Sequence, residues 1–314
     1  MRAILKCWFI LATLLVAWHG AKAMAEERVL DEFEDLQGWT ALSSPGVRVE
    51  LAHDAGHSGR GLRVDFDFQG HGGYLVVRKP FTLDLPGNYA FSFMLRGEAP
   101  TNNFEFKLMD ASGQNVWWRV QRDFAFPAEW QRMVIKKRQL QFAWGPAGGG
   151  MPSAVGALEL AISAGAGGKG SIWLDKLQFE ERESVGPYSP RPTVEASTAV
   201  PGHEPERILD LEPQAGWRSG SVAASQWVML DFVKRREYGG IVIDWDRENY
   251  ATAYQVQLSD DGVNWQTAYS VTDGNGGRDY IYLPDAESRY LRLDLQKSSR
   301  GQGYGILAVM LKPY

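Results

Sequence analysis

The chain alternates apolar and polar residues at a period of two over most of its length. In the first half, aromatic and aliphatic residues occupy every second position in five short runs, 62–68, 91–95, 104–108, 116–120 and 158–162. Side chains at i and i+2 share one face of a β-strand, and no long stretch keeps the 3.6-residue period of a helix. Glycine and proline punctuate the runs as they do turns. The pattern predicts an all-β chain built from sandwiches or jelly rolls.

Alternation also assigns side chains to faces. In the third run, Glu105 and Lys107 alternate with phenylalanine and leucine, so we expect these two residues to face outward. In the fourth run, the same rule points Trp118 into the core and Trp117 and Arg119 toward solvent. The prediction for this strand depends on treating the valines that flank its tryptophans as core residues.

An outward tryptophan beside charged residues is typical of a surface that stacks on sugar rings. Trp117 is therefore a candidate binding residue, joined by Trp144, and Arg96 and Glu159 are possible additions. The alternative is that the loop 142–146 covers Trp117, which then only completes the fold. The 38 aromatic residues of the chain fit either large cores or stacking surfaces.

Composition excludes several classes of protein. The chain has 1 Cys, which rules out a disulfide framework and cysteine-ligated metal centres. It has 33 basic and 38 acidic residues, a formal net charge of −5, which argues against nucleic acid and anionic membranes as partners. No nucleophile elbow, P-loop, dinucleotide fingerprint, H-E-x-x-H motif or E-x-D-x-E motif appears, so no recognisable motif marks a catalytic site.

The N-terminus reads as a cleaved secretory signal at 1–23. Arg2 and Lys6 precede the apolar run 7–18, and Ala-Lys-Ala at 21–23 resembles a cleavage site. Cleavage would remove three of the 33 basic residues and none of the acidic ones, leaving a net charge of −8. We expect a secreted or periplasmic bacterial protein for which a membrane is an unlikely partner.

A proline-rich segment, 184–193, separates two modules. Its three prolines favour a stiff, extended linker that belongs to neither core. The predicted domains are therefore 24–183 and 194–314. Both are long enough to form independent sandwiches.

The second module carries a specific set of motifs, which are Gln226-Trp227-Val228-Met229-Leu230-Asp231-Phe232, Ser259-Asp260-Asp261-Gly262-Val263-Asn264-Trp265 and Ser288-Arg289-Tyr290-Leu291-Arg292-Leu293. Together they resemble the discoidin, or coagulation factor 5/8 C-type, domain, whose bacterial members include carbohydrate-binding module family 32. The resemblance implies an eight-stranded jelly roll. We expect Trp217, Trp227, Tyr254 and Trp265 in its core, and Arg289 and Arg292 in packing and ion pairs.

In that fold, loops at one end of the sandwich meet the ligand. Four loops are candidates, 203–211, 246–251, 273–279 and 298–304. Their aromatic, amide and charged side chains suit glycan recognition. The candidate binding residues are Arg247, Asn249, Tyr250, Arg278, Asp279, Arg300 and Tyr304. The segment 208–214 lacks the D-G-D run that holds calcium in relatives, so the resemblance does not carry that metal over.

The first module opens with Leu30-Asp31-Glu32-Phe33-Glu34-Asp35 and closes with Ile172-Trp173-Leu174-Asp175-Lys176-Leu177. These motifs resemble the galactose-binding-like jelly rolls of carbohydrate-binding module family 11 and of the complex I intermediate-associated protein type. The resemblance implies a structural calcium held by Glu34 and Asp175, whose hard oxygens calcium accepts. The alternative is that both are ordinary strand-end carboxylates.

These features lead to an exported, non-catalytic protein that binds polysaccharide or cell-surface glycan. One alternative is the N-terminal accessory region of a larger exported carbohydrate-active enzyme, with a catalytic domain beyond Tyr314. Another is a surface adhesion module with a protein partner. The candidate loops are polar, which disfavours lipid.

Overall fold

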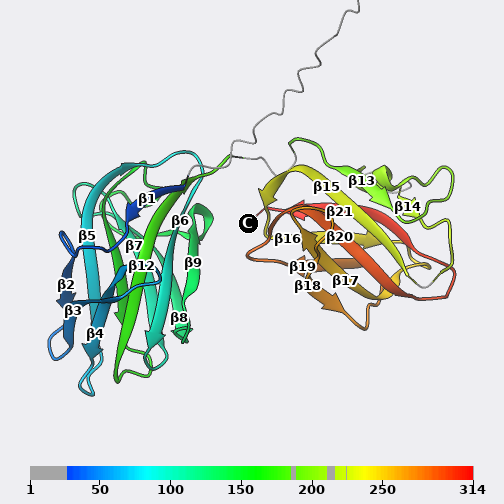
Figure 1. Ribbon diagram of the computed structural model, residues 1–314. Coiled ribbons are helices and arrows are strands. Elements are labelled where there is room, and N and C mark those ends of the chain that lie inside the picture. The colour runs from blue at the N-terminus through cyan, green and yellow to red at the C-terminus, as the bar shows by residue number, and fades with distance from the viewer. Residues whose placement is uncertain (1–26, 185–188, 211–215, 224, 314) are drawn as a thin grey trace, which may run out of the picture. The chain divides into compact units, whose positions relative to one another are not determined.

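A computed structural model describes residues 27–184, 189–210, 216–223 and 225–313 (Figure 1). It divides the chain into two compact units, 1–183 and 184–314. Regular structure in the described residues is strand apart from two short 3-10 helices, Lys137–Gln139 and Pro205–Leu209, so the predicted all-β class is confirmed. The predicted signal peptide, 1–23, lies outside the described residues. None of the described helices is long and apolar enough to cross a membrane.

The N-terminal unit is a sandwich of two antiparallel sheets. The first, called the β12 sheet, runs in the order β3 (Arg48–Ala55), β4 (Arg60–Asp67), β12 (Lys169–Glu181), β6 (Tyr89–Glu98) and β9 (Gln131–Lys136), with β1 (Glu27–Asp31) also paired to β12. The second, called the β7 sheet, runs in the order β10 (Gln141–Trp144), β8 (Val116–Phe124), β7 (Asn102–Met109), β11 (Ala154–Ser163), β5 (Tyr74–Asp84) and β2 (Thr40–Ser43).

Aromatic rings from both sheets fill the core between them. Phe93 of β6 stacks on Phe106 of β7, with ring centroids 6.2 Å apart and planes 5° from parallel. Each such buried ring contributes on the order of 1.5–3 kcal/mol. The inward faces predicted for the runs 62–68, 91–95 and 104–108 are confirmed.

The C-terminal unit is a second antiparallel sandwich of jelly-roll type. Its β20 sheet runs in the order β13 (Thr193–Ala196), β15 (Gln226–Glu237), β20 (Glu287–Ser298), β17 (Ala251–Ser259) and β18 (Gln266–Val271). Its β21 sheet runs in the order β14 (Trp217–Arg218), β21 (Gly305–Lys312), β16 (Gly240–Trp245) and β19 (Arg278–Tyr282).

Two of the four aromatic residues expected in this core lie elsewhere. Trp217 and Tyr254 are buried as predicted. Trp227 lies opposite Asp294, on the outer face of the β20 sheet, because Val228 takes the inward position. Trp265 is half-buried, and the Arg292 guanidinium lies 4.1 Å from its ring centroid. Trp265 therefore packs against Arg292 instead of filling the core.

The predicted linker is not wholly separate from the second unit. Buried Arg236 donates a hydrogen bond to the carbonyl oxygen of Pro190 at 2.7 Å and to that of Phe232 at 3.2 Å. Strand β13 then begins at Thr193. The end of the segment 184–193 is thus fixed to the C-terminal unit, because the Pro190 carbonyl oxygen accepts a hydrogen bond from a buried cation.

Candidate functional site

Strand β8 presents the face opposite to the one predicted from its sequence. Directly opposed residues of an antiparallel pair share a face of the sheet. Trp117 lies opposite Leu108, and Arg119 opposite Phe106, so both point inward. Trp117 is 5% exposed, and its Nε1 donates to the carbonyl oxygen of Gly150 at 2.7 Å. The predicted outward placement of Trp117 and Arg119 is therefore wrong, because pairing with β7 sets the phase of this strand.

Both residues complete the fold. The Arg119 guanidinium donates to the carbonyl oxygen of Val134 and to Oε1 of Gln139, each at 2.9 Å, so it links β8 to the segment that follows in the other sheet. Trp117 meets Phe142 edge to face, with ring centroids 5.7 Å apart. The contact with Phe142 fits the alternative in which the segment 142–146 covers Trp117, although residues 141–144 form strand β10 and not a loop.

Trp118, predicted to be buried in the core, lies on the outer face of the β7 sheet. It belongs to a row of opposed residues that crosses five strands, formed by Thr40, Arg78, Glu159, Lys107 and Trp118. We call the surface around this row the Trp118 face. It comprises Trp118, Trp144, Lys107, Glu105, Glu159 and Arg78.

Two tryptophans and a lysine form one end of the Trp118 face. The rings of Trp118 and Trp144 lie 5.4 Å apart and nearly perpendicular, at 88°. Lys107 Nζ lies 5.8 Å from the first ring centroid and 5.7 Å from the second. Trp144 is 48% exposed, so one indole is open to stack on a ligand. The lysine is held by cation–π attraction to both rings.

The charges on this face are balanced, and three of the four are recessed. Lys107 Nζ pairs with Glu105 Oε2 at 2.7 Å, and the Ser163 hydroxyl donates to Glu105 Oε1 at 2.9 Å. Arg78 Nε donates to Glu159 Oε1 at 2.6 Å. Glu105, Lys107 and Glu159 are each no more than 8% exposed although they point away from the core. The predicted outward direction of Glu105 and Lys107 is confirmed by register, and two cations offset two anions.

Sequence reasoning missed Arg78, Ser163 and Tyr74 on this surface. Tyr74 lies opposite Ser163 at the far end of the same face, with half of its surface exposed. No short motif marks these positions, because only the pairing of β5, β11 and β7 places them together. Glu159, a possible addition from sequence, does join the face.

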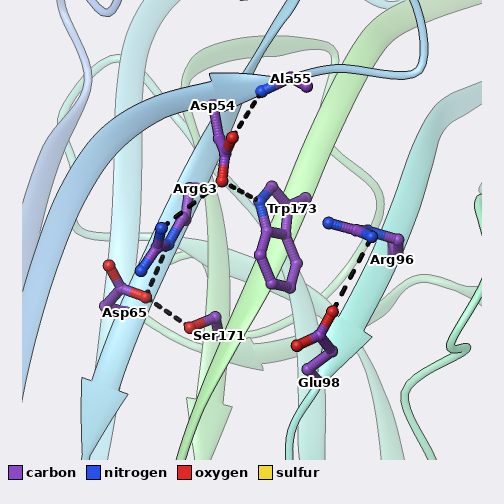
Figure 2. A network of polar contacts seen from close by, with 8 residues as sticks. All are labelled: Asp54, Ala55, Arg63, Asp65, Arg96, Glu98, Ser171 and Trp173. Atoms are coloured by element: carbon purple, nitrogen blue, oxygen red, sulfur yellow. Dashed lines mark hydrogen bonds and ion pairs between the residues drawn. The ribbon is translucent and has the colours of Figure 1, made fainter.

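Arg96, the other possible addition, belongs to the opposite side of the unit. Figure 2 shows it on the outer face of the β12 sheet, where Trp173 lies between Arg63 and Arg96. The two guanidinium carbons lie 5.9 and 4.1 Å from a Trp173 ring centroid. Trp173 Nε1 donates to Asp54 Oδ2 at 3.0 Å, and this hydrogen bond holds the pKa of Asp54 below its ordinary value. The hydrophobic core separates this network from Trp118.

Glu34 and Asp175, the predicted calcium ligands, meet at one turn. Asp175 Oδ2 accepts a hydrogen bond from the backbone N–H of Ser58 at 2.9 Å, and Glu34 Oε1 accepts one from that of Arg60 at 3.1 Å. Gly59 between them has φ +59°, and a Cβ there would lie 1.9 Å from Glu34 Oε1. The turn therefore requires glycine if the carboxylate is to approach.

The backbone is strained beside both carboxylates. Phe33 and Lys176 have φ of 54° and 51°, values uncommon for residues other than glycine. Asp175 is fully buried, and the backbone N–H groups of Ser58 and Lys176 donate to its two oxygens. Its donor chemistry fits calcium, but calcium takes six to eight oxygens. No group of three His, Cys, Asp or Glu side chains gathers in the described part of the chain, so backbone or amide carbonyls and waters would have to supply the rest.

Three of the four predicted loops of the C-terminal unit converge at Tyr250, because a Cβ at Gly276 in the loop 273–279 would lie 2.7 Å from the Tyr250 ring, and Tyr250 also contacts the loop 298–304. The Ser299 N–H donates to the Tyr250 carbonyl oxygen at 2.9 Å, and the Gly305 N–H to that of Asn249 at 2.6 Å. Arg300 pairs with Glu248 at 2.7 Å. The loop 203–211 ends at a residue outside the described ranges.

The predicted binding side chains in these loops differ in availability. Arg247 and Arg300 are exposed at the rim, and Asn249 and Tyr250 are half-buried. Asp279 Oδ2 accepts hydrogen bonds from Trp245 Nε1 at 2.8 Å and from the Tyr254 hydroxyl at 2.6 Å. This carboxylate supports buried aromatics instead of projecting from a loop tip.

Tyr304 and Arg278 depart further from the prediction. Tyr304 is buried in the core, because its backbone pairs with Ser219, so its expected place at an exposed loop tip is wrong. Arg278 is the first residue of β19 and binds Asp244 with two hydrogen bonds, the longer at 2.7 Å. Its side chain lies on a sheet face and not in a loop.

The sequence of the C-terminal unit, with its two sheets and end loops, was compared with models of known protein families. Residues 193–310 match the F5/8 type C domain family. The predicted resemblance of this unit is confirmed. The match covers all strands of this unit from β13 to β20 and most of β21. No curated protein matches the chain.

Solved structures similar to the chain include carbohydrate-binding modules. A chitosan-binding module of a Paenibacillus chitosanase/glucanase, in complex with chitotriose, is 25% identical, covering 38% of this chain and 95% of that module, with a TM-score of 0.37. A family 11 module of a Clostridium thermocellum cellulase is 18% identical, covering 52% and 99%, with a TM-score of 0.41. A family 32 module of Clostridium perfringens, in complex with galactose, is 15% identical, covering 38% and 92%, with a TM-score of 0.36.

Proposed function

We propose that this chain is an exported, non-catalytic protein that binds neutral polysaccharide or cell-surface glycan through the Trp118 face. The observation that carries the proposal is the pair of perpendicular tryptophans, one of them 48% exposed, beside a recessed row of charged side chains. An indole ring covers the apolar face of a pyranose, and the charged side chains exchange hydrogen bonds with hydroxyls. The equal number of cations and anions favours a neutral chain.

Two carboxylates lie on this face, but their arrangement supports binding rather than hydrolysis. Glycoside hydrolysis uses two carboxyl groups that face the scissile bond across a cleft. Glu105 is engaged by Lys107 and Ser163, and Glu159 by Arg78. Each carboxylate is therefore paired with a neighbouring side chain on an exposed sheet surface, and the two do not face each other across a cleft.

Affinity electrophoresis and calorimetry of the full chain with neutral polysaccharides test the proposal. Trp118→Ala should weaken binding about tenfold or more, as is usual for a central aromatic contact. Trp130→Ala removes a half-buried tryptophan on the opposite side of the same unit and serves as the matched control. Equal binding by wild type and Trp118→Ala, with both folded, would refute the assigned site.

Export and calcium are separate parts of the proposal. The apolar run 7–18 and the site at 21–23 support a secretory signal, which N-terminal sequencing of protein recovered outside the cytoplasm tests. The approach of Glu34 and Asp175 to one turn supports a structural calcium that fixes the first and last strands of the N-terminal unit. This ion would stabilise the fold without contacting the Trp118 face.

A further inference from the structure

The outer face of the β21 sheet presents two tyrosines that pack into neither core. Tyr280 and Tyr282 occupy alternate positions of edge strand β19, while Ile281 between them points into the core. They are 67% and 73% exposed, more than any other aromatic side chain in the described residues. Alternate residues of a strand lie about 7 Å apart on one face. The two rings therefore form a short, regularly spaced surface.

The residues opposite the two tyrosines on β16 leave the tyrosine rings uncovered. Tyr282 lies opposite Gly240, which has no side chain, and Tyr280 lies opposite Val242, which is 1% exposed. A Cβ at Gly240 would lie 2.2 Å from the carbonyl oxygen of Ile281, so this position is restricted to glycine. Neither Gly240 nor Val242 of β16 covers the tyrosine rings, which are 67% and 73% exposed.

An ion pair lies at one end of the same surface. Arg278 is opposite Asp244 and binds it in bidentate fashion. Hydrogen bonds with Asp244 and with Tyr280 raise the pKa of Arg278. We call Tyr280, Tyr282, Gly240, Val242, Arg278 and Asp244 the β19 platform. Its charged members cancel, and its exposed apolar atoms are tyrosine rings that end in hydroxyls.

This chemistry selects one kind of occupant. A lipid surface is met by exposed aliphatic tips or a basic rim, neither of which the platform has. Flat rings with polar edges, beside a neutral donor–acceptor pair, match a polyhydroxylated chain that has apolar ring faces. The linear arrangement along β19 matches several consecutive sugars better than one terminal sugar.

We propose that the β19 platform is a second glycan site, which holds a neutral polysaccharide chain along strand β19. It lies on a sheet face and meets the predicted end-loop site only at Arg278, the first residue of β19. The inference rests on the proposed function, that this protein binds glycan. Two sites on one chain would raise the affinity for long polymers above that for short oligosaccharides.

The test measures binding of the full chain to galactomannan, mixed-linkage β-glucan and hydroxyethyl cellulose, with polygalacturonate and chitosan as charged probes. In a Trp118→Ala/Trp144→Ala background, residual binding to a neutral polymer is expected. Adding Tyr280→Ala/Tyr282→Ala should reduce that binding at least tenfold. Tyr269→Ala, which removes another exposed tyrosine from edge strand β18, should leave it unchanged.

The outcomes separate this inference from the proposed function. If the wild type binds none of the polymers, the proposed function fails. If the wild type binds and the Trp118→Ala/Trp144→Ala variant has lost all binding, the Trp118 face stands and the β19 platform is refuted. Light scattering measures the molecular mass of Tyr280→Ala/Tyr282→Ala. If the mass changes while polymer binding does not, the platform serves self-association and the inference is overturned.

Discussion

Replacing Asp175 with asparagine should destabilise the N-terminal unit, because this buried carboxylate serves two backbone donors. The N–H groups of Ser58 and Lys176 donate to its two oxygens at 2.9 and 2.7 Å. Asparagine offers one acceptor oxygen, so one N–H group would face an amide NH2. Hydrogen bonds to a charged group contribute about 1.5–3 kcal/mol each, and an unsatisfied buried donor costs about 1–3 kcal/mol. We expect Asp175→Asn to lower the free energy of unfolding of this unit by about 2–4 kcal/mol.

Calorimetry or urea unfolding followed by circular dichroism measures the effect. In a unit of this size each kcal/mol lowers Tm by about 2–4 °C, so the transition of the N-terminal unit should move by roughly 5–15 °C. Glu181→Gln, an exposed neutralisation on the same strand β12, is the control and should change stability by less than about 0.5 kcal/mol. An Asp175→Asn transition as close to wild type as that control would refute the reasoning.

Calcium supplies a second arm of the same experiment. A ligand at 100 times its Kd stabilises the folded state by about 2.7 kcal/mol. Wild type should therefore unfold at a higher temperature in calcium than in EDTA, and Asp175→Asn should show no such difference. Identical wild-type transitions in the two buffers would reject the calcium proposal. The predicted loss of hydrogen bonds in Asp175→Asn would still stand.

Two other predictions concern stability. Trp117→Ala should cost about 3–5 kcal/mol of unfolding free energy, far more than Trp118→Ala, since only Trp117 is buried; equal costs in urea unfolding would contradict the assigned phase of β8. Asp231 accepts hydrogen bonds from Arg289 at 3.0 and 2.9 Å, which hold its pKa below the ordinary 3.8. Ionised Asp231 therefore stabilises the C-terminal unit above about pH 4, and this stabilisation is lost as pH falls through the folded-state pKa. Asp231→Asn should be less stable than wild type at pH 7 and lose less stability on acidification. If the unfolding free energy of the variant falls with pH as steeply as that of wild type, this role is excluded.

Much of the fold could be predicted from local patterns. The alternation around Phe93 and Phe106 identified strands and their inward faces, because a buried strand face tolerates few polar residues. The motifs around Trp265 and Arg292 identified the F5/8 type C unit, although Trp265 itself packs outside the core. These features depend on residues close together in sequence.

The candidate site was less predictable, since it is assembled across strands. The run 116–120 carries large side chains at both phases, so alternation alone could not tell whether Trp117 or Trp118 faces solvent. The opposition of Lys107 and Trp118 in the β7–β8 pair decided it. Arg78 also joined only through the register of β5 with β11.

The sequence by itself determined that this chain forms two β-sandwiches with aromatic cores, because period-two burial is encoded residue by residue. Tertiary structure alone decided which aromatics remained outside. Trp144 and the tyrosines of β19 are exposed because of their strands' places at sheet edges and the residues opposite them, Gly240 among these. Those partners lie tens of residues away in the chain, and only hydrogen-bonded pairing between strands brings them together.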